Sequence, residues 1–153
     1  MNFSELSRLI EENMGDVVEF GNSSCDLNPS SERLKETEKL LGVKLPPSYL
    51  WFVKNYGGGE VYGEEIYSIY PVLSEQSVGD IAYQTKWFRD KGFVSKSDVV
   101  ISSNNFGEIF FLNTSESDDL GEYPVYIKVG DSKMKYADNF AEFLYKRISA
   151  PEA

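Results

Sequence analysis

The chain has 153 residues, of which 41% are hydrophobic and 14% aromatic. A chain of this length and composition buries enough apolar surface to fold as one domain, so extensive disorder is excluded. Its 25 acidic and 15 basic side chains give a net charge of -10, which repels nucleic-acid phosphates and anionic lipids, so we expect no direct binding to nucleic acid or membranes.

The first thirty residues predict a helix, a short strand and a loop. Asn2 and Glu5 have the spacing of a capping box, and apolar residues then recur at helical spacing up to Gly15. A strand is predicted at 17–20, and a loop at 21–31, where glycine, serine, asparagine and proline are frequent. The N-terminus lacks the basic start and continuous apolar run of a signal peptide, and a single cysteine cannot form an internal disulfide. Both features predict a cytoplasmic protein.

Two helices with clear ends follow. The first is predicted from a serine cap at 30 or 31 to residue 41, and Gly42 suits the left-handed conformation that ends many helices. Pro47 suits the first position of the second helix, whose apolar residues repeat up to Tyr56. The glycines at 57–59 then end it. No Gly-Lys-Ser or Gly-Lys-Thr follows them, so a helix stop explains them better than a phosphate-binding loop.

The rest of the chain is predicted to be rich in strands. Apolar residues at 66, 69 and 72 indicate a strand that ends near Pro71, and helical spacing returns from 77 to 91. The sequence NNFG between two later strands is typical of a hairpin turn. A capping-box spacing, Asn139 with Glu142, begins the last helix. The predicted later elements are strands at 99–102, 108–113 and 124–129 and a helix from 139 to 148.

This order of elements predicts an α+β fold. Helices stand at both ends of the chain, the centre is rich in strands, and no regular βαβ alternation occurs. We therefore expect a largely antiparallel central sheet with helices packed on one face. One domain is predicted over 1–153, with an N-terminal helix and loop at 1–29 and the main body at 30–148.

The sequence contains no histidine, which removes the commonest catalytic designs. There is no imidazole to activate a nucleophile, to act as general base near neutral pH or to bind a metal. Two carboxylate pairs, Glu64 with Glu65 and Asp118 with Asp119, have the chemistry for acid–base or Mg²⁺ catalysis. Both pairs fall in predicted turns or loops, which do not hold adjacent side chains in a convergent geometry. We expect no enzyme activity, no cofactor and no metal site.

An ordered set of segments resembles the SUKH superfamily. The segment ETEKLLGVKLPPSYLWFVKNYGGGEVY at 36–62 is similar to the family signature in its Leu-Gly helix end, its Leu-Pro pair and its glycine turn. The segment VVISSNNFGEIFFLNTSESDDLGEYPVYIKV resembles the family's central hairpin and following strand, and NFAEFLYKRI resembles its closing helix. The resemblance covers residues 30–148 in order.

The resemblance implies a protein-binding domain without catalytic residues. In bacteria such domains typically bind and neutralise a polymorphic toxin, often a nuclease or deaminase. A nuclease must be basic to hold its substrate, and an acidic chain is attracted to such a partner. The alternatives are a regulatory or scaffold module of the same fold, or acidity that serves solubility alone. The candidate partner-binding residues lie near the glycine turn and in the acidic loop: Glu60, Tyr62, Glu64, Glu65, Glu116, Asp118 and Asp119.

Overall fold

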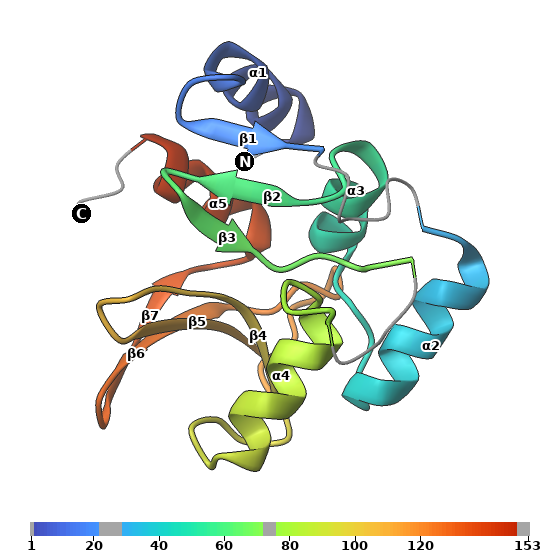
Figure 1. Ribbon diagram of the computed structural model, residues 1–153, viewed down its shortest axis with the longest axis vertical. Helices are drawn as coiled ribbons and strands as arrows, with labels where there is room; N and C mark the ends of the chain where they lie inside the picture. Colours follow the sequence, from blue (N-terminus) through green and yellow to red (C-terminus); the bar gives the residue numbers. More distant parts are fainter. Residues whose placement is uncertain (1, 22–28, 72–75, 150–153) are drawn as a thin grey trace.

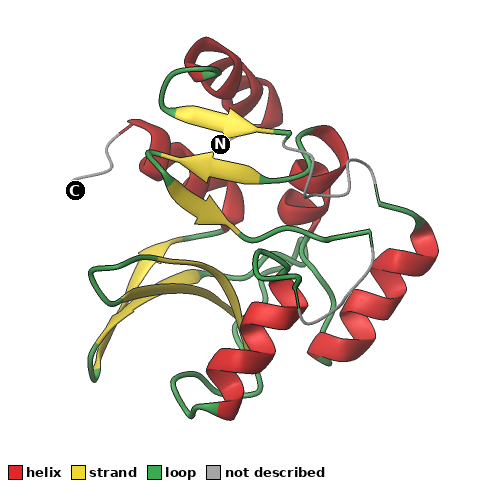
Figure 2. Ribbon diagram, in the orientation of Figure 1, coloured by secondary structure: helices red, strands yellow, loops and turns green. Residues whose placement is uncertain are grey.

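The computed structural model describes residues 2–21, 29–71 and 76–149. Its strands form one seven-stranded sheet in the order β1-β2-β3-β4-β5-β6-β7, and every strand pairs antiparallel with its neighbours in the sequence (Figures 1 and 2). The strands are β1 Val18–Phe20, β2 Gly59–Val61, β3 Glu64–Ile66, β4 Asp98–Ser103, β5 Glu108–Asn113, β6 Val125–Val129 and β7 Ser132–Ala137. The helices are α1 Phe3–Asn13, α2 Ser31–Leu41, α3 Pro47–Asn55, α4 Ile81–Asp90 and α5 Phe140–Ser149.

The predicted α+β class is confirmed, with an antiparallel sheet and a helix near each end of the chain. The helix caps at Asn2 and Ser30 and the left-handed Gly42 are also where the sequence predicts them. Most of the predicted loop at 21–31 lies outside the described residues. Among the helices of the described residues, none combines the length and the apolar character that crossing a lipid bilayer requires.

Two predicted elements differ from the structure, and the sequence did not predict every strand. The helix predicted from residue 77 begins at Ile81, because the Asp80 carboxylate accepts hydrogen bonds from the backbone N–H groups of Ala82 and Tyr83 and so fixes the N-cap. The strand predicted through residues 66 and 69 ends at Ile66, and position 72 lies outside the described residues. The sequence did not predict β7, whose first four residues are exposed and show no apolar alternation.

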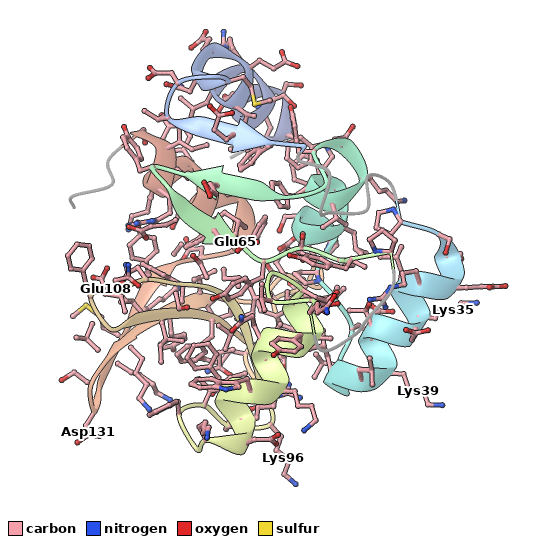
Figure 3. The ribbon with its side chains drawn as sticks, in the orientation of Figure 1. Lys35, Lys39, Glu65, Lys96, Glu108 and Asp131 are labelled. Atoms are coloured by element: carbon pink, nitrogen blue, oxygen red, sulfur yellow. The ribbon has the colours of Figure 1, made fainter. Side chains whose placement is uncertain are left out.

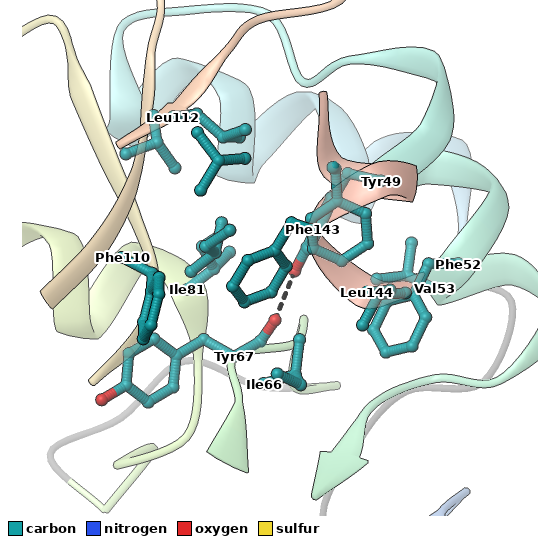
Figure 4. Close-up of a cluster of buried hydrophobic side chains, with 14 of the residues drawn as sticks. Tyr49, Phe52, Val53, Ile66, Tyr67, Ile81, Phe110, Leu112, Phe143 and Leu144 are labelled. Atoms are coloured by element: carbon teal, nitrogen blue, oxygen red, sulfur yellow. Dashed lines mark hydrogen bonds between the residues drawn. The ribbon is translucent and has the colours of Figure 1, made fainter. Parts of the chain in front are cut away.

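Aromatic side chains fill the core between α3, α5 and the sheet (Figure 4). The ring of Phe110 on β5 lies 5.3 Å from that of Phe143 on α5. The hydroxyl of Tyr49, which is fully buried, donates a hydrogen bond of 2.8 Å to the carbonyl oxygen of Tyr67. A buried tyrosine needs such a partner, because an unpaired hydroxyl would cost about 1–3 kcal/mol. This bond ties α3 to the chain that follows β3.

Helices cover both faces of β5, whereas the sequence led us to expect helices on one face. Phe110 faces α5, and its neighbour Ile109 must point to the opposite face because strand side chains alternate. Ile109 lines a hollow of about 390 Å³ together with Trp87 and Phe88 of α4. The sheet is therefore enclosed at this point by α5 on one side and α4 on the other.

A carboxylate from the long loop after β5 holds the start of α3. The helix has no capping side chain of its own, since Pro46 stands at its N-cap. Glu122 instead accepts hydrogen bonds of 2.8 Å from the Ser48 backbone N–H and 2.6 Å from the Ser48 hydroxyl. Both residues are buried. A negative charge is favourable at a helix N-terminus, so the Glu122 carboxylate both caps α3 and fastens the loop.

We predict that Glu122→Gln lowers the free energy of unfolding by about 1.5–3 kcal/mol, the range for hydrogen bonds to a charged group. The amide keeps the volume but loses the charge and one acceptor oxygen. Urea denaturation measures the loss. The control is Asp119→Asn in the same loop, which is exposed and should change stability by no more than about 0.5 kcal/mol. Equal losses in the two variants would contradict the capping role.

Candidate partner-binding surface

Three glutamates form a row across the first three strands. Glu19 on β1 pairs with Glu60 on β2, and Glu60 pairs with Glu65 on β3. Residues directly opposite in an antiparallel pair point to the same face, with Cβ atoms about 4.5–5.5 Å apart. Their neighbours Val18 and Val61 are buried on the other face. The alternation of these strands therefore places three carboxylates side by side on the outer face, which we call the acidic row.

The charge of the acidic row is not neutralised within its own strands. β1, β2 and β3 contain no lysine or arginine. Burial of the carboxylate, and then the negative charge of Glu60, raise the pKa of Glu65 above its ordinary value. Part of that burial comes from Gly79, because the Glu65 carboxylate and the Tyr70 hydroxyl occupy the space that a Cβ at residue 79 would need. Like charges in direct opposition destabilise a sheet, so this arrangement costs stability.

Glu64 has a different environment from its neighbour Glu65. The two are adjacent on β3 and so point to opposite faces of the sheet. Glu64 accepts a hydrogen bond of 2.7 Å from the guanidinium of Arg147 on α5 and one of 3.2 Å from the side-chain amide of Asn104. It therefore joins β3 to α5, and it does not belong to the acidic row.

Tyr62 stands in the two-residue turn between β2 and β3. Its φ angle is +51°, and Tyr62 is the sole non-glycine residue with positive φ among the described residues. A positive φ at residue 62 and at Gly63 is typical of a hairpin turn that favours asparagine followed by glycine. The tyrosine ring is 48% exposed, and its hydroxyl makes a long contact of 3.4 Å to the carbonyl oxygen of Ile148. A strained and half-exposed aromatic residue therefore stands beside the acidic row.

Helix α1 adds further acidic side chains at the same end of the molecule. Figure 1 shows α1 next to β1, with β2 and β3 following, and α4 at the opposite end. Tyr62 connects to this region, because its backbone N–H donates to the carbonyl of Val17 just before β1. The additional exposed carboxylates of α1 and the following turn are those of Glu5, Glu11, Glu12 and Asp16, against the single cation of Arg8.

The long loop lies away from the acidic row. It adjoins the Asp98 end of β4, where the backbone of Thr114 bonds to Ser97, whereas Ser102 near the other end of β4 pairs with Ile66. In the loop itself, one Asp118 oxygen accepts from two backbone N–H groups, and Glu116 accepts from a side-chain amide and a tyrosine hydroxyl. Asp119 is exposed. The structure thus brings Glu60 and Glu65 together and places Glu64 on the reverse face. Tyr62 stands in the turn that joins their strands, with its hydroxyl directed toward α5, and Glu116, Asp118 and Asp119 lie apart from them.

The carboxylate pairs do not form a catalytic arrangement in the structure. Glu64 and Glu65 diverge to opposite faces of β3, and Asp118 is engaged in organising its own loop. Within residues 2–21, 29–71 and 76–149, no group of three or more histidine, cysteine, aspartate or glutamate side chains is placed to hold a metal ion. The single cysteine of the chain, Cys25, lies outside the described residues. The surface chemistry that the described residues support is the binding of an oppositely charged molecule.

Sequence reasoning missed Glu19, which completes the acidic row. The alternation Val18-Glu19-Phe20 is a strand signal that assigns Glu19 to the exposed face. It could not indicate that β1 would pair with β2, because residues 21–58 lie between Phe20 and the matching strand. The pairing register, rather than any local motif, brings Glu19 opposite Glu60.

We predict that Glu65→Gln raises the free energy of unfolding at pH 7 by about 0.2–1 kcal/mol, the range for cross-strand pairs. Because the pKa of Glu65 is raised in the folded state, the folded protein binds this proton more tightly than the unfolded chain does. The cost of the charge therefore appears as the pH rises above 4.5, the ordinary pKa, and is complete above the raised pKa.

Urea denaturation at pH 7 and pH 4 tests this prediction, and the gain should vanish at pH 4. Glu12→Gln on α1 is the matched control. Glu12 is exposed, and its substitution removes the same charge at a position outside the acidic row. A gain from Glu65→Gln that is equal at both pH values would show that the charge of Glu65 is not its cause.

The comparison with known families agrees with this architecture. The model of a family described as SMI1-KNR4 cell-wall, SUKH_6, matches residues 31–144. The matched segment runs from the start of α2 to within α5 and contains β2 and β3 with Glu60 and Glu65. It covers about three quarters of the chain. The chain therefore belongs to the SUKH superfamily.

Proposed function

We propose that this protein is a non-enzymatic immunity protein that binds a basic toxin domain, such as a nuclease or deaminase, and blocks its activity. The acidic row of Glu19, Glu60 and Glu65 is the observation that carries the proposal. The membership of the chain in the SUKH superfamily supports a role in binding another protein. In this proposal the protein acts in the cytoplasm, needs no cofactor and covers the partner's surface without transforming a substrate.

The acidic row suits a basic partner because β1, β2 and β3 supply no cation to neutralise its charge and give it a rigid support. Each glutamate projects from a paired strand, so the backbone is already ordered and only side-chain rotamer freedom is lost when it meets a cation. A surface with one sign of charge attracts an oppositely charged protein and speeds their encounter. The repulsion within the row would be relieved by lysine or arginine side chains of the partner. The repulsion destabilises the free protein, so its relief would add to the free energy of binding.

Tyr62 suits the role of an aromatic anchor at the rim of the acidic row. A left-handed conformation costs an ordinary residue roughly 1–2 kcal/mol, and asparagine or glycine would avoid most of this. Tyr62 exposes 48% of its surface, and the hydrogen bond of its side chain among the described residues is the long contact from the hydroxyl to Ile148. Tyrosine is among the residues that dominate binding energies at protein interfaces. The strain at Tyr62 therefore supports a binding role for the ring rather than a folding role.

We predict that Glu19→Lys with Glu60→Lys weakens binding to the toxin domain encoded by the neighbouring reading frame by about tenfold or more, mainly through slower association. Surface plasmon resonance at low and moderate ionic strength measures both rates. Binding of the unmodified protein should itself weaken as salt is added, because the charges are exposed. Loss of protection against the toxin in a cleavage or deamination assay should accompany the loss of binding.

The matched control is Glu32→Lys with Asp131→Lys, which makes the same change in net charge. Asp131 lies far from Glu65 in the molecule (Figure 3), and Glu32 is an exposed residue of the first turn of α2. An equal effect of the two double variants would assign binding to net charge and not to the acidic row. Asp119→Lys tests the long loop separately.

If the unmodified protein neither binds nor inhibits the toxin at micromolar concentration, the immunity role is wrong and a regulatory or scaffold role is favoured.

We predict that Tyr62→Asn has opposite effects on stability and on binding. Asparagine tolerates positive φ, so the free energy of unfolding should rise by about 1 kcal/mol. Loss of the ring should weaken toxin binding by about tenfold or more, as is typical of an interface hot spot. Thermal unfolding and surface plasmon resonance give the two values. A variant that is more stable and binds equally well would show that Tyr62 is no anchor.

A further inference from the structure

The opposite end of the molecule exposes large apolar side chains around the ends of α2 and α4. Trp87 on α4 is 44% exposed, Phe93 just after α4 is 45% exposed, and Leu40 in the last turn of α2 is 54% exposed. The Trp87 ring lies 6.1 Å from that of Phe93. We call these three residues the Trp87 surface. Contiguous exposed apolar groups on a folded protein typically mark an interaction site.

The Trp87 surface contains a hollow between two helices. Leu40 and Leu41 of α2 and Ala82, Tyr83 and Trp87 of α4 line a hollow of about 500 Å³, together with Lys86, Arg89 and Asp90. The α4 side of the hollow is rigid, because the Arg89 guanidinium donates hydrogen bonds to the carbonyl oxygens of Leu41 and Asp98. A groove with helices on both sides and an apolar floor has the form that receives the apolar face of a third helix.

The charge around the Trp87 surface is opposite to that of the rest of the chain. The two segments 38–45 and 86–98 contain six cations and three carboxylates, whereas the remaining residues contain nine cations and 22 carboxylates. The six cations are Lys39, Lys44, Lys86, Arg89, Lys91 and Lys96. Each of the three carboxylates already has a partner: Asp90 pairs with Lys86, Glu38 accepts from the Leu45 backbone N–H, and Asp98 accepts from the Ser95 backbone N–H. Figure 3 shows Lys39 and Lys96 at the end of the molecule away from Glu65.

We infer that the Trp87 surface is a second docking site, which binds an amphipathic helix with acidic residues beside its apolar face. The apolar side chains of the helix would enter the hollow between α2 and α4, and its carboxylates would meet the surrounding lysines. The charge complementarity selects this occupant, because a basic segment would be repelled by five exposed cations. This site goes beyond the proposed function, since it has the opposite sign to the acidic row and does not need the same partner.

A protein helix fits these observations better than a nucleic acid. The hollow is lined largely by aliphatic and aromatic side chains, and Asp90 lies among them. A nucleic acid would bring many phosphates to a chain whose net charge is -10. An acidic helix brings only a few carboxylates to the surface, and these can lie opposite the lysines around the hollow.

Labelled synthetic peptides test the inference on the full-length protein. Two peptides of about four helical turns share one apolar pattern, and their polar positions are glutamate in one and lysine in the other. The Trp51→Phe background leaves Trp87 as the only tryptophan, so a change in its emission locates binding. We expect the acidic peptide to bind about tenfold or more tighter than the basic one by fluorescence anisotropy, and to shift the Trp87 emission.

Variants of the surface and other probes complete the test. Leu40→Ser and the pair Lys91→Glu with Lys96→Glu should each weaken binding of the acidic peptide about tenfold, while Glu60→Lys should leave it unchanged. Circular dichroism confirms that each variant is folded. Equal or tighter binding of the basic peptide or of single-stranded oligothymidylate would overturn the inference. So would dimerisation through Trp87, seen by light scattering and abolished by Leu40→Ser, or no binding of the acidic peptide at millimolar concentration.

Discussion

The register of β1, β2 and β3 is the constraint on which the core and the acidic row both depend. Side chains alternate along a strand, so a slip of one residue would turn Glu19 and Glu60 into the core and expose Val18 and Val61. Gly59 helps to fix this register, because any Cβ at that position would collide with the carbonyl oxygen of Glu19. The glycine turn that ends α3 thus also lets β1 approach β2. The energetic cost of three aligned carboxylates is tolerated because the buried face of the same strands holds the register in place.

The acidic row combines residues from inside and outside the matched family segment. The SUKH match begins at residue 31, so β2 and β3 belong to it and β1 does not. Glu60 and Glu65 therefore stand on the family core, while Glu19 and the carboxylates of α1 are contributed by the preceding residues. A binding surface built in this way can change its outer part without changing the strands beneath it. This arrangement would suit a protein whose partner varies while its fold does not.

Local signals predicted the helices and several strands, but long-range pairing determined the surface. Helix ends were predictable because Asn2, Ser30 and Gly42 act within one helical turn of their own residues. Strand β7 was not, because Lys133, Met134 and Lys135 lie exposed on an edge strand and give no alternation. Of the candidate residues near the glycine turn, Glu60 and Glu65 share a face because they pair across β2 and β3, whereas Glu64 points to the other face and the acidic loop lies elsewhere. No sequence pattern reveals that Glu122 caps α3, since it lies 74 positions after Ser48.

The two ends of the molecule carry opposite charges, and this limits how partners can approach. The carboxylates of α1 and the acidic row lie at one end, and the lysines that follow α2 and α4 lie at the other. A basic protein is attracted to the first end and repelled by the second, so the charge distribution orients it before any contact forms. The lysines around Trp87 therefore have an effect even when nothing is bound there. If a basic partner binds as proposed, they would direct it to the sheet and leave the hollow between α2 and α4 accessible while the acidic row is occupied.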